Sequence, residues 1–139
     1  MGRVTVKTTI ESWGDLVLAE RELLPSDQVR FVEVGDALVD TRATTLSLPK
    51  RLIQALDLWP ARTQKVLMGD ALVTLQMYGT VRLTIQERDC VTNVLEVPDD
   101  WPVTIGRILM HHLDLVVDMK GQRLIGNPAH GGEHVIELY

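Results

Sequence analysis

The side chain best placed to do chemistry in this sequence is the carboxylate of Asp40. It follows directly after an apolar run at 37–39 (Ala-Leu-Val), which is typical of a strand buried on both faces. A carboxylate at the end of a buried strand is costly unless it is hydrogen-bonded, paired or functional. Taken alone, the pattern leaves two interpretations open: Asp40 caps a turn, or Asp40 takes part in acid–base chemistry.

The stretch around Asp40 resembles the active-site loop of the retropepsin-like aspartic proteases (clan AA). In that family two or three apolar residues precede Asp-Thr-Gly-Ala, and Ser, Thr or Asp follows; here residues 39–44 are Val-Asp-Thr-Arg-Ala-Thr. A second family motif, an apolar pair followed by Gly-Arg and an apolar helix, is matched by Thr-Ile-Gly-Arg-Ile-Leu at 104–109. The segments 115–118 and 123–128 look like the ending of the bacterial members of the family.

The resemblance covers residues 30–130, with the two motifs in the family's order, and it implies both a fold and a reaction. The fold would be mainly β, a retropepsin-like closed barrel (acid protease fold) with one or two short helices. The reaction would be peptide hydrolysis by an aspartic endopeptidase, in which two close carboxylates share one proton because both cannot ionise. One carboxylate is the general base for a water, while the other polarises the scissile carbonyl.

Asp40 would be the catalytic residue, and the family pattern also implies a homodimer. The chain contains a single Asp-Thr motif, so the second carboxylate would come from Asp40 of a second copy across a two-fold axis. By the same resemblance Thr41 would hydrogen-bond across that axis, and Ala43 and Thr44 would line the substrate cleft. The hairpin at 66–73, centred on Gly69, is the expected flap over the substrate.

Gly106 and Arg107 would support the catalytic loop in this family. Gly106 would let the backbone pass close beneath the loop, and Arg107 would make a structural contact there.

Arg42 departs from the family pattern, which has glycine at that position. Glycine there allows an unusual backbone conformation and lets the substrate lie against the main chain. An arginine would point into the cleft or make the loop reorganise, and its charge would lower the pKa of the carboxylates. Three interpretations remain open: an inactive homologue that serves as a dimerisation or peptide-binding module, an enzyme with a shifted pH dependence, or a chain altered at this site.

Histidine and cysteine residues offer weaker alternatives. His130 and His134 have ligand-like spacing but lie in a loop rich in glycine, and the adjacent His111 and His112 cannot both face one site. We therefore expect these histidines on a solvated surface, and Cys90 as a small core residue. No metal and no cofactor is expected, since the glycines between 121 and 132 lack the strand–turn–helix context of a phosphate loop.

The elements that must position these residues are mainly strands. We expect strands at 3–10, 16–20, 29–34, 37–39, 46–48, 65–68, 71–78, 80–86, 90–97, 103–105, 115–118 and 123–125, and an edge strand at 135–139. Turns are expected at 13–15, 35–36 and 69–70, and helices at 50–58 and 107–113.

Composition limits the remaining possibilities. The chain has 139 residues, 45% hydrophobic and 24% charged, which fits one folded domain over 1–139 whose residues 1–28 form N-terminal strands of open role. A net charge of −5 gives no basic patch, so we expect a peptide or protein substrate and neither nucleic acid nor a membrane as partner. The absence of a signal-peptide pattern, the lack of an apolar run of about 20 residues and the single cysteine predict a cytoplasmic location.

Overall fold

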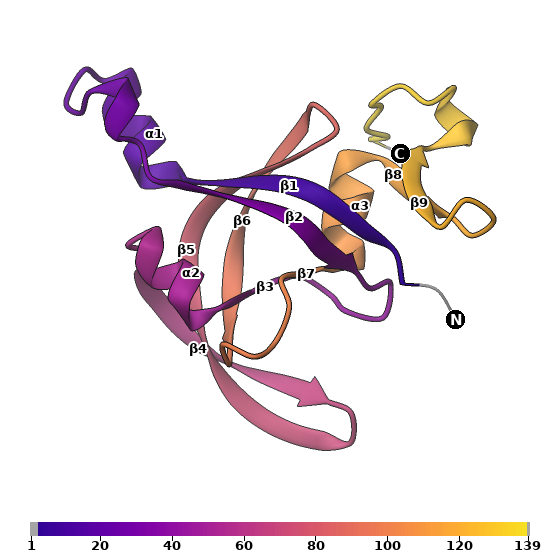
Figure 1. Ribbon diagram of the computed structural model, residues 1–139, viewed down its shortest axis with the longest axis horizontal. Coiled ribbons are helices and arrows are strands. Elements are labelled where there is room, and N and C mark those ends of the chain that lie inside the picture. Colours follow the sequence, from indigo (N-terminus) through magenta and orange to yellow (C-terminus); the bar gives the residue numbers. More distant parts are fainter. Residues whose placement is uncertain (1–2, 139) are drawn as a thin grey trace.

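The computed structural model describes residues 3–138, and strands make up most of it. One seven-stranded mixed sheet has the order β1-β2-β7-β3-β6-β5-β4, and β1 also pairs with β5. Because of this additional pairing, all of these strands except β4 curl into a near-closed ring (Figure 1). The predicted mainly β class is confirmed.

The chain alternates these strands with short helices. The strands of the large sheet are β1 (Thr5–Ser12), β2 (Phe31–Val39), β3 (Leu46–Pro49), β4 (Trp59–Met68), β5 (Ala71–Ile85), β6 (Arg88–Val97) and β7 (Thr104–Ile105). A second, two-stranded sheet consists of β8 (Leu115–Asp118) and β9 (Arg123–Gly126). The helices are α1 (Trp13–Glu20), α2 (Lys50–Ala55) and α3 (Arg107–Leu113), with single 3₁₀ turns at Ser26–Gln28 and Pro128–His130.

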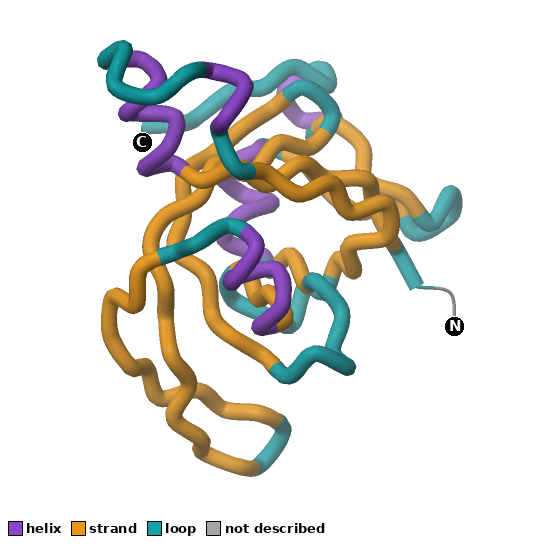
Figure 2. The backbone as a smooth tube through the Cα atoms, turned by 60° about the vertical axis from the view of Figure 1, so that its left-hand side comes forward, coloured by secondary structure: helices purple, strands orange, loops and turns teal. Residues whose placement is uncertain are grey.

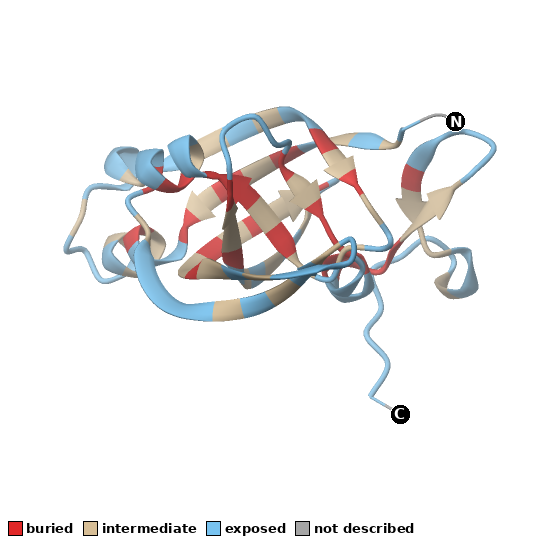
Figure 3. Cartoon of the chain, turned by 90° about the horizontal axis from the view of Figure 1, so that it is seen from below, coloured by how far each residue is buried: buried red, intermediate tan, exposed pale blue. Residues whose placement is uncertain are grey.

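The hydrophobic core occupies the inside of the ring. Buried positions, red in Figure 3, recur along the strands because alternate side chains of a strand point to the same face. Leu46, Leu83 and Ile105 are fully buried there, and Leu109 of α3 packs on the same cluster. Each such side chain stabilises the fold by roughly 1.5–3 kcal/mol, so the ring is a rigid base for the loops that leave it.

Strand β7 lies between β2 and β3 and brings the two sequence motifs together. It pairs in parallel with β2, Val39 opposite Ile105, and antiparallel with β3, Leu46 opposite Ile105. The loop from Asp40 to Thr45 therefore starts and ends beside the residues that follow β7. The closest approach is at Gly106, where an added Cβ would lie 2.4 Å from the carbonyl carbon of Thr44.

The hairpin of β4 and β5 extends away from the ring (Figures 1 and 2). Met68 pairs with Ala71 across a turn in which Gly69 has a φ of +64°, a conformation that favours glycine. The hairpin expected around Gly69 is confirmed, although β5 continues through Gly79 to Ile85 and does not end there.

The N-terminal segment corrects two predictions. Residues 13–15 were expected to form a turn and residues 16–20 a strand, but both belong to α1. The described part of the segment 1–28 therefore contains one strand, one α-helix and the 3₁₀ turn at Ser26–Gln28. The Ser12 hydroxyl accepts a hydrogen bond from the N–H of Asp15 at 3.2 Å and caps the helix. The buried Asp15 carboxylate in turn accepts hydrogen bonds from the backbone and guanidinium of Arg30, which fixes α1 to the start of β2.

Two further turn and strand predictions were wrong. Residues 35–36 form no chain reversal, because β2 is continuous and Gly35 and Asp36 bulge opposite the single residue Lys7. Residues 135–138 form no edge strand, since the N–H of Val135 donates to the Asp114 carboxylate at 3.1 Å. Tyr139 lies outside the described residues.

The helices also differ from expectation. The described residues contain three α-helices, where one or two were expected. Helix α2 ends at Ala55 and not at residue 58, because Asp57 takes a φ of +49° and turns the chain into β4. Within residues 3–138 no helix has the length and apolar character needed to cross a membrane.

We predict that Gly106→Ala lowers the free energy of unfolding by about 1–3 kcal/mol, because the new methyl group must displace backbone and not a flexible side chain. Urea unfolding followed by tryptophan fluorescence measures the change. Gly35→Ala is the matched control, since its Cβ would meet no atom within 4 Å. Equal stability of Gly106→Ala and the original chain would contradict the close approach.

Candidate functional site

Asp40 is held by its backbone, while its side chain faces outwards. Its N–H donates to the carbonyl of Ile105 at 3.1 Å, and its own carbonyl accepts from the N–H of Ala43 at 3.1 Å. The side chain of Asp40 is 25% exposed. The arrangement presents the carboxylate at the open end of β2, where a ligand or a second chain can reach it.

The guanidinium of Arg42 pairs with the carboxylate of Asp40. Arg42 Nε donates to Asp40 Oδ1 at 3.2 Å and Nη2 to Oδ2 at 3.4 Å, while the Arg42 N–H donates to Oδ1 at 2.9 Å. The side-chain hydrogen bond of Arg42 lowers the pKa of Asp40, and this effect outweighs partial burial, which acts in the opposite direction. Asp40 is therefore ionised at neutral pH, with both carboxylate oxygens engaged.

The second motif, at residues 104–109, supports the loop that carries Asp40. The N–H of Arg107 donates to the carbonyl of Ala43 at 2.9 Å, and the N–H of Ile108 donates to the carbonyl of Thr44 at 3.1 Å. The Arg107 guanidinium also donates to the carbonyl of Arg42 at 3.3 Å. Arg107 and the neighbouring Gly106 thus both contact the loop that carries Asp40.

An open groove of about 830 Å³ lies between this loop and the β4–β5 hairpin. Arg42, Ala43 and Thr44 line one side of this groove. All three were predicted to lie at a substrate-binding cleft. Three predicted site residues do not line the groove: Asp40, the exposed Thr41, and Gly69 at the hairpin turn.

The opposite wall of the groove includes Val66, within the hairpin at 66–73 that was predicted to cover the substrate. Sequence reasoning did not identify the remaining walls, which come from the rest of β5, from β6 and from the loop before β7, and include Leu75, Met77, Val97 and Trp101. The alternation of β5 indicated that Leu75 and Met77 share a face. It gave no sign that this face is partly uncovered, because that depends on where the hairpin bends away from the ring.

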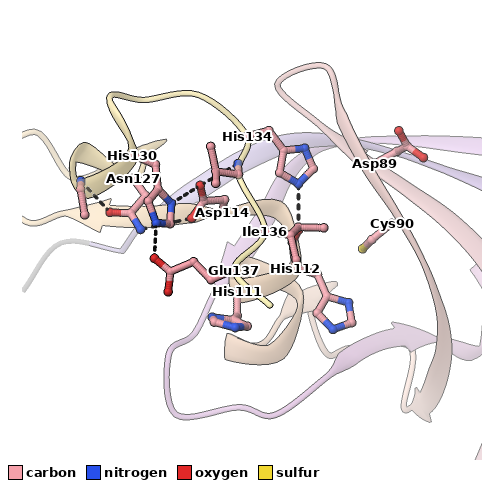
Figure 4. Close-up of a pocket in the computed structure, with 12 residues that line it drawn as sticks. Asp89, Cys90, His111, His112, Asp114, Asn127, His130, His134, Ile136 and Glu137 are labelled. Carbon is pink, nitrogen blue, oxygen red and sulfur yellow. Dashed lines mark hydrogen bonds and ion pairs between the residues drawn. The ribbon is translucent and has the colours of Figure 1, made fainter. Parts of the chain in front are cut away.

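A second polar cluster joins the end of α3 to the C-terminal segment (Figure 4). Asp114 is buried, with a φ of +55°, and Oδ1 accepts from Asn127 Nδ2 at 3.1 Å. His130 lies between two carboxylates: Nδ1 is 2.7 Å from Asp114 Oδ2 and Nε2 is 2.7 Å from Glu137 Oε1. Since both ring nitrogens face acceptors, the arrangement favours the doubly protonated imidazolium.

The pKa values in this cluster follow from these contacts. Burial by itself would raise the pKa of Asp114, but hydrogen bonds from His130, from the N–H of Val135 and from Asn127 lower it to about 2. The hydrogen bonds to Glu137 and Asp114 raise the pKa of His130. The cluster therefore holds a charged His130 against ionised carboxylates.

The histidine prediction needs one correction. The side chain of His130 is 17% exposed and paired, so it is not on a solvated surface; His111, His112 and His134 are exposed as expected. His130 was missed because its partners lie 16 residues before it and 7 residues after it in the chain. Among residues 3–138 no group of three or more potential ligands could hold a metal ion.

Cys90 lines the edge of the pocket of about 410 Å³ next to this cluster. It packs against the hydrophobic core, as expected. Burial, with a smaller contribution from Asp89, raises the pKa of the thiol to about 11. Cys90 is therefore protonated at neutral pH and poorly suited to act as a nucleophile.

Comparison with known proteins adds no relative. No protein-family model matches the chain, and no curated protein matches it in sequence.

We predict that Arg42→Gly raises the pKa of Asp40 towards the ordinary value of an aspartate, because the largest stabilising contact of the ionised form is removed. A carbon-detected NMR titration of the Asp40 carboxyl group measures this change. Arg51→Gln is a control, since Arg51 pairs with Asp99 on another part of the surface. An unchanged Asp40 pKa in Arg42→Gly would contradict the pairing.

We predict that His130→Gln destabilises the fold more at about pH 5.5 than at about pH 9. The raised pKa of His130 means that its charged interaction is fully present below the ordinary histidine pKa and is lost as the pH rises through the raised value. Urea unfolding at both pH values measures the effect, with His112→Gln as the exposed control. A loss of stability that does not change with pH would argue against a charged His130.

Proposed function

We propose that this protein is a retropepsin-like aspartic endopeptidase that hydrolyses peptide bonds as a homodimer. The observation that carries the proposal is the packing of Gly106 and Arg107 directly against the loop of Asp40. Two motifs that are far apart in the sequence meet at one place, which is the arrangement that the family resemblance requires. The near-closed ring of strands supports the closed barrel of the acid protease fold as the finer description.

In this proposal the two copies each contribute Asp40 to one dyad. The exposed Thr41 hydroxyls would hydrogen-bond across the two-fold axis and hold the two loops together. One carboxylate takes a proton from a water, whose oxygen attacks the scissile carbonyl carbon, while the protonated carboxylate donates a hydrogen bond to the carbonyl oxygen. The proton then passes to the leaving nitrogen as the carbon–nitrogen bond breaks.

The groove supplies the binding part of this proposal. A peptide lying between Ala43 and Thr44 on one side and Val66 and Leu75 on the other would contact Arg42, the ion-pair partner of Asp40, although Asp40 does not itself line the groove. The β4–β5 hairpin would act as the flap, with Gly69 at its turn. Because the leucines at its tip are exposed (71% for Leu67, 63% for Leu72), closure over a bound peptide would bury apolar surface.

Arg42 sets the pH dependence of the proposed reaction. A dyad works with one shared proton, and a guanidinium beside each carboxylate favours the state in which both are ionised. Since the pairing lowers the pKa of Asp40, the active singly protonated state moves to lower pH. The proposed peptidase is therefore expected to be most active at a lower pH than it would be without Arg42.

A second candidate function is favoured by the same ion pair. If Arg42 keeps both Asp40 carboxylates paired in the dimer, the groove binds peptides without cutting them. The protein would then be an inactive homologue that serves as a dimerisation or peptide-binding module.

We predict that Arg42→Gly raises kcat/KM for peptide cleavage at neutral pH, because a higher Asp40 pKa leaves a larger fraction of the dyad singly protonated. Asp40→Asn is expected to lower it by about 10²–10⁴-fold, because it removes the acid–base group. Cleavage of a peptide library by the three chains at acidic and at neutral pH, followed by mass spectrometry, measures both effects.

Other outcomes separate the candidates. Equal activity of all three chains would show that Asp40 is not the catalytic group. Binding without cleavage by any of them would favour the peptide-binding module. Sedimentation at micromolar concentration tests the dimer separately, and a monomeric chain would exclude the shared dyad.

A further inference from the structure

The groove beside Asp40 carries a charge opposite to that of the whole chain. Nineteen acidic and fourteen basic residues give the chain a net charge of −5. Among the described residues that line the groove, however, there is no carboxylate, whereas Arg42, Lys65 and Arg107 contribute three cations. They come from three different elements: the Asp40 loop, β4 and the start of α3. The remaining lining is mostly apolar, with Met77, Val97 and other aliphatic side chains.

Two of these cations have no carboxylate partner, although Arg107 also donates a hydrogen bond to the carbonyl of Arg42. Neither Lys65 nor Arg107 forms an ion pair with a carboxylate anywhere in residues 3–138. Arg42 is paired with Asp40 alone, and its side chain is 90% exposed. Ion pairs that are exposed to this degree contribute little to stability, because water screens them and the long side chain must be held in place. Arg42 can therefore exchange the Asp40 carboxylate for a carboxylate on a ligand at little cost in free energy.

We propose that the groove selects extended peptides in which an aspartate or glutamate side chain accompanies apolar side chains, and that this acidic side chain takes the Arg42 guanidinium from Asp40. The inference rests on the proposed function, because it names the substrate class of the same site. Charge complementarity specifies the acidic residue, and the aliphatic walls specify its apolar neighbours.

The exchange has a physical basis and a catalytic consequence. A peptide that fills the groove displaces water around Arg42, whose side chain is 90% exposed, so a carboxylate on the peptide forms a less screened ion pair with the guanidinium than Asp40 does in the free protein. Asp40 then loses the contact that keeps it ionised, and the dyad can retain its shared proton. An acidic substrate would thus release the restraint that Arg42 places on the catalytic group, whereas a neutral substrate would leave it in place.

Fluorescein-labelled peptides test this inference. We would use peptides of about eight residues, the length of an ordinary strand, made of Leu, Val and Phe with amidated C-termini and one Glu at varied positions, together with matched Gln and Lys peptides. Fluorescence anisotropy measures their binding to the full chain. We expect the best Glu peptide to bind about tenfold more tightly than its Gln counterpart, with the Lys peptide weakest.

Three variants locate the source of the preference. Arg42→Gly and Lys65→Gln should each reduce the ratio of Glu to Gln binding, whereas Lys120→Gln, an exposed cation outside the groove, should leave it unchanged. In cleavage assays the original chain should prefer the Glu peptide, and Arg42→Gly should cut the Glu and Gln peptides at similar rates.

Several results would overturn the inference. Equal binding of the Glu, Gln and Lys peptides would do so, as would a preference that Lys120→Gln weakens as much as Arg42→Gly. A Gln peptide with a free C-terminus is the further control, and tight binding of this peptide alone would assign the cations to a chain end and not to a side chain. Glu preference without cleavage would support the inference and contradict the proposed endopeptidase activity. Cleavage without Glu preference would support the endopeptidase activity and contradict the inference.

Discussion

The candidate site depends on one backbone constraint, the insertion of β7 between β2 and β3. Val39 and Leu46 both pair with Ile105, so the loop that carries Asp40 leaves and re-enters the sheet on the two sides of a single short strand. Gly106 follows at once, and only the absence of a side chain lets it touch the backbone of Thr44. The position of the Asp40 carboxylate is therefore set by strand pairing and close backbone contact.

On this rigid base the chemistry of the site is set by side chains that can exchange partners. Arg42 engages Asp40 from an exposed position, and it also lines the groove where a ligand would lie. In the proposed function the same residue restrains the Asp40 carboxylate and would recognise a ligand. A glycine, which the family pattern has at this position, has no guanidinium for either contact.

Local patterns predicted most of the residues in the strands of the ring, and the apolar strand that leads into Asp40, although they divided β2 and β5 into shorter strands. They failed where a distant partner decides the local structure. In the helix after Ser12, Asp15 is anchored by Arg30, which lies 15 residues later, and the bulge at residues 35–36 is defined by the pairing of β2 with β1. The paired state of His130 and the open face above Met77 likewise depend on residues that come together only in the folded chain.

The pairing of β7 also affects the order in which parts of the chain fold during synthesis. A chain that emerges from its N-terminus exposes β2 and the Asp40 loop long before β7 exists, and β1 must wait for the second half of β5 to close the ring. Such non-local pairings form late and fold slowly. During synthesis the Asp40 loop therefore lacks its β7 partner until Thr104 and Ile105 have emerged, so the loop geometry that the proposed dyad needs would arise only late in synthesis.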